Sequence, residues 1–181
     1  CAAAAVCFLT DPIEKPEEGD ESSLFASMPS TFHFLSGAGG WETELYWNGD
    51  GSFFGIFEDA DAGSLERCEF TGTVGALTRV DDLEYSTHIT DLNYDKPGET
   101  TTENGISVTT AEPYGLDDAD ELRIYLPGYP VSKLPAGALN WIQSAEEFWD
   151  GKSPSVLPFY VLYNVNGEQA FFSADWSAFE E

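Results

Sequence analysis

The stretch that decides the fold is WETELYWNGDGSFFGIF, residues 41–57. Apolar and polar side chains alternate from Trp41 to Trp47, which is the period-two pattern of a strand that buries one face. Both tryptophans share the inward face, so we expect their rings to pack in a core. The residues NGDG at 48–51 predict a hairpin turn, because Asn and Gly adopt positive φ at low cost. Residues 52–57 return as a second strand, in which Gly55 indicates a bulge or a bend.

Short strands separated by turns continue outward from this hairpin. They are predicted at residues 31–35, 67–75, 83–89, 106–110, 121–126, 159–163 and 168–172. Residues 58–64, 95–105 and 111–120 are polar or acidic and are predicted to be loops. Apolar side chains have roughly helical spacing within residues 131–149, so one short helix is expected there.

About nine strands in largely local order predict an all-β fold. We expect a small antiparallel meander barrel with one short helix, because closure removes the exposed edges that an open meander leaves. A two-sheet β-sandwich is the alternative. The barrel domain is predicted to span residues 30–176, followed by a tail at residues 177–181.

The charge of the chain is strongly negative. Seven Lys and Arg residues face 33 Asp and Glu residues, which gives a formal net charge of −26. Nucleic acid and anionic membrane headgroups are therefore poor partners, and no nucleic acid is expected to bind, because the long-range field repels polyanions. Cationic partners or divalent cations are favoured, unless the acidity serves only to keep the protein soluble. A monomer is expected.

The first residues predict a location outside the cytoplasmic membrane. Residues 1–10 are largely apolar, and they are predicted to be the remnant of a signal peptide or membrane anchor. Alternatively, Cys1 is the lipid-modified first residue of a lipoprotein. Residues 11–29 are acidic and contain prolines, so a disordered tether is expected. The domain would then be associated with the membrane or cell wall, or secreted.

Several motifs resemble a known group of proteins. They are SGAGGW at 36–41, NGDGSF at 48–53, CEFTG at 68–72, EPYGLDDADE at 112–121 and YLPG at 125–128. Together they resemble a family of uncharacterised extracytoplasmic proteins of Gram-positive bacteria, many of them lipoproteins or membrane-anchored. The resemblance implies an envelope location and no particular activity. The tripeptide GGW at 39–41 is also similar to the lipocalin signature, which implies a barrel.

Two sets of candidate binding residues follow from these patterns. A barrel mouth that binds a small ligand would be lined by inward-facing apolar side chains, namely Trp41, Leu45, Phe53 and Tyr85. Calcium is the possible cofactor, because two acidic connections collect hard oxygen ligands, namely Glu58, Asp59, Asp61, Asp117, Asp118 and Asp120. The alternative for the acidic residues is a solvated surface.

No catalytic motif is present in the sequence. There is no Gly-x-Ser-x-Gly elbow and no His-Glu-x-x-His, and Cys68 alternates with apolar residues as a buried thiol does. We therefore expect a non-enzymatic β-barrel tethered in the cell envelope, which binds an unknown small ligand or an envelope protein. The alternatives are a carboxylate-dependent hydrolase acting on envelope glycans, and a calcium-dependent structural domain.

Overall fold

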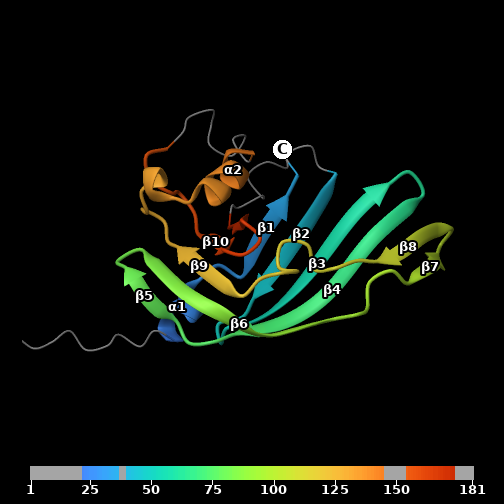
Figure 1. Cartoon of the computed structure of the whole chain (residues 1–181), viewed down its shortest axis with the longest axis horizontal. Coiled ribbons are helices and arrows are strands. Elements are labelled where there is room, and N and C mark those ends of the chain that lie inside the picture. The colour runs from blue at the N-terminus through green and yellow to red at the C-terminus, as the bar shows by residue number, and fades with distance from the viewer. Residues whose placement is uncertain (1–21, 37–39, 145–153, 174–181) are drawn as a thin grey trace, which may run out of the picture.

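The structure is a computed structural model that describes residues 22–36, 40–144 and 154–173 (Figure 1). Its strands are β1 (Thr31–Leu35), β2 (Trp41–Trp47), β3 (Ser52–Asp61), β4 (Ser64–Val74), β5 (Thr78–Asp81), β6 (Glu84–Tyr94), β7 (Thr100–Glu103), β8 (Ile106–Thr110), β9 (Glu121–Tyr125), β10 (Val161–Asn164) and β11 (Gln169–Phe172). The helices are α1 (Ser22–Ser27), the single 3-10 turn η1 (Val131–Lys133) and α2 (Ala136–Ser144).

Eight strands close into an antiparallel barrel. Their spatial order is β1-β2-β3-β4-β6-β9-β10-β11, which is also their order along the chain. The ring closes where β11 pairs with β1, through His33 and Phe172. The predicted meander barrel is therefore confirmed, and the two-sheet sandwich is not formed. The order of the strands explains this outcome, because strands that follow one another along the chain pair side by side in the ring.

Three strands extend the sheet beyond the barrel. β5 continues along the edge of β6, β8 pairs in parallel with the first half of β4, and β7 pairs with β8. Residues 100–103 were predicted to lie in a loop, and that prediction is wrong. They form a strand because their β-branched threonines pair with β8 across a two-residue turn, in which Asn104 and Gly105 both have positive φ.

The predicted acidic loop at residues 58–64 is also mostly strand. β3 and β4 stay paired from Ser52–Thr73 to Asp61–Ser64, so only two residues are left for the turn. An ion pair between Glu58 and Arg67 joins the two strands in this region, with 2.9 Å between Oε1 and Nε. The hairpin therefore continues past Phe57, the last apolar residue of the alternating pattern, where the strand was predicted to end.

Gly55 does not mark a bulge, because the β3–β4 register is continuous around it. Its partner across the strands is Phe70, and a Cβ added at Gly55 would overlap the Phe70 ring. Gly72 makes room for the ring of Phe53 in the same way. These strand glycines therefore serve packing, as a side chain in either place would displace an aromatic ring from the core.

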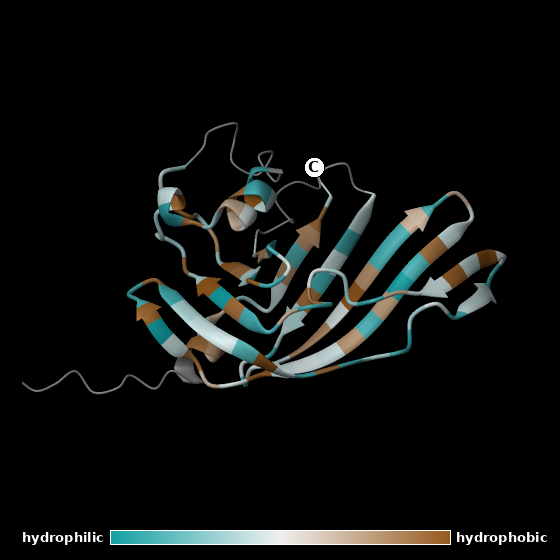
Figure 2. Cartoon of the chain, viewed as in Figure 1, coloured by the Kyte–Doolittle hydropathy of each residue, from teal (hydrophilic) through white to brown (hydrophobic). Residues whose placement is uncertain are grey.

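Apolar side chains fill the barrel. Along β1 to β4 buried residues alternate with more exposed ones, and the hydropathy of the residues changes along the ribbons (Figure 2). The side chains buried in the barrel cluster are Phe25, Met28, Phe32, Phe34, Leu45, Trp47, Phe53, Phe57, Cys68, Phe70, Leu77, Leu116, Leu122, Ile124, Leu162 and Phe171. The interior of the barrel is thus occupied by side chains, which leave no room there for a ligand.

Helix α1 closes the end of the barrel at which β2 finishes. Phe25 and Met28 are 7% and 8% exposed, and the Phe25 ring lies 5.6 Å from that of Trp47. The prediction of a tether over residues 11–29 is therefore wrong for residues 22–29, since two apolar side chains at this spacing bury against the barrel. Residues 11–21 of the predicted tether, like residues 1–10, lie outside the described residues.

Helix α2 covers the outer face of the closing strands, and it confirms the short helix predicted within residues 131–149. Ala138 and Ile142 of α2 are fully buried in a second cluster with side chains of β9, β10 and β11. All four residues of β10 are buried, because one face packs in the barrel and the other under α2. Within the described part of the chain, neither helix has the length and apolar character to span a membrane.

Candidate functional site

The connection between β8 and β9, residues 111–120, covers the end of the barrel opposite α1. Leu116 inserts into the barrel cluster and is fully buried. The Tyr114 carbonyl accepts a hydrogen bond from Thr43 Oγ1 at 2.7 Å, and the Gly115 carbonyl accepts one from Asn164 Nδ2 at 3.0 Å. Side chains of β2 and β10 therefore hold this connection in place by its backbone.

Gly115 is essential to that placement. Its φ is +98°, which disfavours any residue with a side chain. A Cβ at this position would lie 2.7 Å from the Phe171 ring and 2.8 Å from the Phe34 ring. The sequence predicted an acidic loop here, and in the structure the middle of this loop is an apolar plug formed by Gly115 and the buried Leu116.

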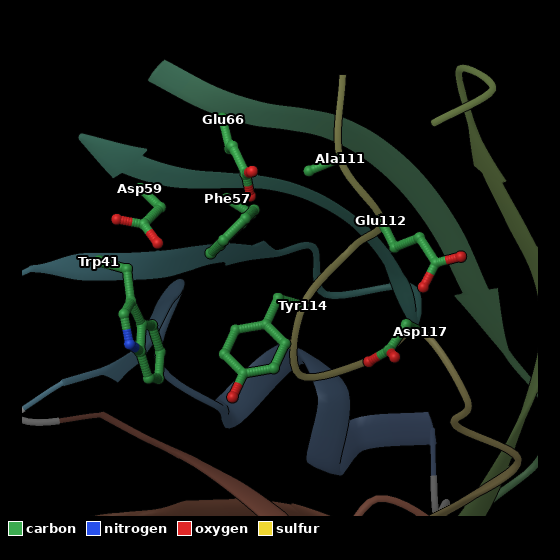
Figure 3. A pocket seen from close by; sticks show the side chains of 8 residues that line it. All are labelled: Trp41, Phe57, Asp59, Glu66, Ala111, Glu112, Tyr114 and Asp117. Carbon is green, nitrogen blue, oxygen red and sulfur yellow. The ribbon is translucent and has the colours of Figure 1, made fainter. Parts of the chain in front are cut away.

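A cavity of about 410 Å³ lies between this connection and the strands β2, β3 and β4. Three aromatic rings, one methyl group and four carboxylates line it, and they belong to Trp41, Phe57, Tyr114, Ala111, Asp59, Glu66, Glu112 and Asp117 (Figure 3). The Tyr114 ring lies 4.8 Å from that of Trp41 at 75°, and 5.5 Å from that of Phe57 at 64°. The three rings thus form steeply inclined apolar walls.

Strand register explains why charged and aromatic side chains share this cavity. Trp41 of β2 is directly opposite Asp59 of β3, which is directly opposite Glu66 of β4. Directly paired residues project from the same face of a sheet, so these three form one row on the inner face. Phe57 lies two residues before Asp59 and belongs to that face as well. On this inner face, apolar side chains pack in the core, and the carboxylates of Asp59 and Glu66 follow them toward the end of the barrel.

Of the four residues predicted to line a ligand pocket, one lines this cavity and three do not. Trp41 lines the cavity described above. Leu45 and Phe53 lie deep in the barrel cluster, with exposed fractions of 0% and 2%. Tyr85 is half-buried on β6 and packs against the same cluster. Of the four, Trp41 alone therefore has a place in this candidate site.

The two acidic connections predicted for calcium do approach each other. Asp59 from the first and Asp117 from the second line the same cavity. Among the described residues, no group of three or more His, Cys, Asp or Glu side chains is arranged to hold a metal ion. Calcium binding at these residues stays a prediction.

The other four predicted acids bond to neighbours in the fold. Their partners are Arg67 Nε for Glu58, the Ala62 amide for Asp61, Asn164 Nδ2 for Asp118 and His88 Nδ1 for Asp120. The Asn164 bond of Asp118 helps to fix the connection that covers the barrel. The side chains of Glu58 and Asp120 are 48% and 73% exposed, so these contacts are compatible with the solvated surface given as the alternative.

The electrostatic environment of the cavity is negative. No Lys, Arg or His lines it, and none of its four carboxylates forms an ion pair within residues 22–36, 40–144 and 154–173. Next to it, burial and, to a smaller extent, the nearby charges of Asp95 and Glu112 together raise the pKa of the Cys68 thiol to about 11. Cys68 is buried, as predicted, and stays protonated at neutral pH.

Sequence reasoning missed Phe57, Glu66, Glu112 and Tyr114 as members of the site. A signal for Phe57 was present, because Phe57 and Asp59 are two residues apart and share a face if the strand continues. Tyr114 and Glu112 reach the cavity through a connection whose path depends on the buried Leu116. Such a long-range placement leaves no periodic pattern in the sequence.

Comparison with protein-family models, with curated proteins and with solved structures finds no match for this chain.

Proposed function

We propose that this protein is a non-enzymatic binding module of the cell envelope, and that its ligand occupies the cavity beside Trp41 and Tyr114. The observation that carries the proposal is the contrast between a filled barrel and this lined cavity at its mouth. A concave site with aromatic walls and a few polar groups is the usual form of a small-ligand site.

The envelope location rests on the amino-acid sequence. The apolar residues 1–10, the acidic residues that follow and the net charge of −26 all favour a domain held outside the cytoplasmic membrane. Proteinase K added to intact protoplasts tests this location. We expect digestion of the protein while a cytoplasmic marker survives, and equal protection of both would contradict the location.

Ligand binding is testable with a panel of small cationic, neutral and anionic aromatic or alkyl compounds. Two-dimensional NMR of the full chain would follow the backbone amides of Trp41, Phe57 and Tyr114 as each compound is added. We expect at least one class of compound to shift these amides in a saturable way, with little effect on Trp47. If no compound shifts them, or if the shifts centre on Trp47, the proposed site is wrong.

A carboxylate-dependent hydrolase acting on envelope glycans is the second candidate function. It is favoured by the gathering of four carboxylates around aromatic rings, since sugars stack on rings and glycosidases use pairs of carboxylates. Incubation with purified peptidoglycan and assay of new reducing ends separates the two candidates. We expect no release; release that is lost in Glu66→Gln would replace the binding proposal with the hydrolase.

A further inference from the structure

We infer that the ligand of this cavity is an organic ammonium ion, held by the rings of Trp41, Phe57 and Tyr114 and by the carboxylates around them. The inference rests on the proposed function, and it names the chemical class of the ligand. Two independent features carry it, namely the arrangement of the rings and the unpaired charge of the surrounding acids.

The rings form a corner that suits a methylated or alkylated cation. Tyr114 packs against Trp41 at 75° and against Phe57 at 64°, and all three rings line the same cavity (Figure 3). The negative face of an aromatic ring attracts a cation, and the attraction is strongest where water is excluded from the contact. Alkyl groups on the cation would also be removed from water against these rings.

The carboxylates supply charge that the fold leaves uncompensated. Asp59 and Glu66 are directly opposite each other on neighbouring strands, an arrangement in which like charges repel. Glu112 and Asp117 bring two more negative charges from the connection that covers the barrel. A bound cation would relieve this repulsion, whereas an anionic or neutral ligand would leave it in place.

The composition of the walls favours an organic cation over a metal ion. Calcium takes six to eight oxygen ligands, and three of the eight lining side chains are aromatic, with a tyrosine hydroxyl as their only oxygen. The volume of about 410 Å³ is within the range of small-molecule sites, and it exceeds the space that a bare ion needs. A charged head with apolar substituents matches both the rings and the acids.

A matched pair of compounds tests the charge requirement directly. Choline and 3,3-dimethylbutan-1-ol have nearly the same shape, and they differ in the positive charge on the branched head. By calorimetric titration of the full chain we expect choline to bind about tenfold more tightly, or more, and added salt to weaken choline selectively.

The outcomes separate this inference from the proposed function. Equal binding of the two compounds at the cavity would overturn the ammonium inference and leave the binding function in place. Binding of neither compound, together with failure of the whole compound panel, would overturn both. Preference for the neutral alcohol would also overturn the inference.

Two pairs of substitutions test whether the charge acts within the cavity. Glu112→Gln with Asp117→Asn removes two exposed carboxylates from the cavity, so we expect choline affinity to fall about tenfold while the fold stays intact. The control, Glu69→Gln with Glu99→Gln, removes two exposed carboxylates that do not line it. An equal loss in the control would mean that net charge alone attracts choline, and that the cavity does not hold it.

Discussion

Trp41 and Trp47 occupy equivalent places on one strand but lie in different environments. Both project from the inner face of β2, six residues apart. Trp47 is 4% exposed, stacks on Phe53 at 5.9 Å and is covered by Phe25. Trp41 is half-buried and presents its ring to the cavity beside Tyr114. The same pattern in the sequence thus places one ring in the core and the other in a candidate site.

The difference comes from what covers each end of the barrel. At the Trp47 end, the short helix α1 and the residue that follows it lie over the opening, with Phe25 and Met28 buried. At the Trp41 end, the cover is the connection 111–120, which buries Leu116 and leaves Tyr114, Glu112 and Asp117 beside a cavity. Strand periodicity determines which side chains face inward, and the covering segments determine whether they become core or site.

Removing the cover at the sealed end is expected to have the largest effect on stability. Phe25→Ala should lower the free energy of unfolding by about 3–5 kcal/mol, because it leaves a cavity against Trp47. Urea denaturation measures the loss, and faster hydrogen exchange of the Trp47 indole would locate it. Leu157→Ala, in the cluster under α2, is the control; it should destabilise the protein without selectively exposing Trp47. Unchanged exchange at Trp47 in Phe25→Ala would contradict the role given to α1.

Displacing the cover at the open end is expected to have the next largest effect. Gly115→Ala should cost about 1–3 kcal/mol from backbone strain, with more from its contacts with Phe34 and Phe171, and it should weaken choline binding. Gly63→Ala is the matched control, because Gly63 has φ +87° and nothing within 4 Å of an added Cβ. Equal stability losses in the two variants would show that the plug at Gly115 is not closely packed.

A smaller change should separate the position of the cover from the stability of the fold. Thr43→Val removes the hydrogen bond to the Tyr114 carbonyl and should cost about 1 kcal/mol, with a loss of choline affinity. Thr87→Val is the control, because Thr87 is equally buried and bonds the Gly75 carbonyl at 2.9 Å, far along the chain from the cavity residues. We expect a similar stability loss there without a loss of affinity. Equal affinities in the two variants would contradict the positioning role of Thr43.

The smallest expected effect is that of calcium. Asp59 and Asp117 share a cavity with aromatic walls, so millimolar calcium should leave the melting temperature nearly unchanged relative to chelator. Differential scanning calorimetry measures this. A clear calcium-dependent rise would favour the calcium-dependent structural domain over the organic-cation site.

Much of the barrel was predictable, because local patterns suffice for a meander. The alternation from Trp41 to Trp47 and the turn at residues 48–51 place β2 beside β3, and hairpins also join β3 to β4 and β10 to β11. The strand ends were not predictable in this way. β3 continues through Glu58 and Asp59, although these acidic residues do not have the sequence pattern of a strand. Pairing with β4 keeps them in the extended conformation.

The site was only partly predictable, for a different reason. Trp41, Asp59 and Asp117 were each identified, but as members of two unrelated sets. They meet because a connection more than fifty residues beyond β3 folds back over the barrel and is anchored by Leu116. The Thr43 and Asn164 hydrogen bonds that fix this path come from strands at opposite ends of the chain. A pattern within any single segment cannot report such an arrangement.

The most direct test of the account is an intermolecular NOE measurement between choline and the two tryptophans of β2. The account predicts contacts from the choline N-methyl protons to the ring protons of Trp41 and Tyr114, and none to those of Trp47. Contacts to Trp47, or saturable binding with no contact to Trp41, would contradict it.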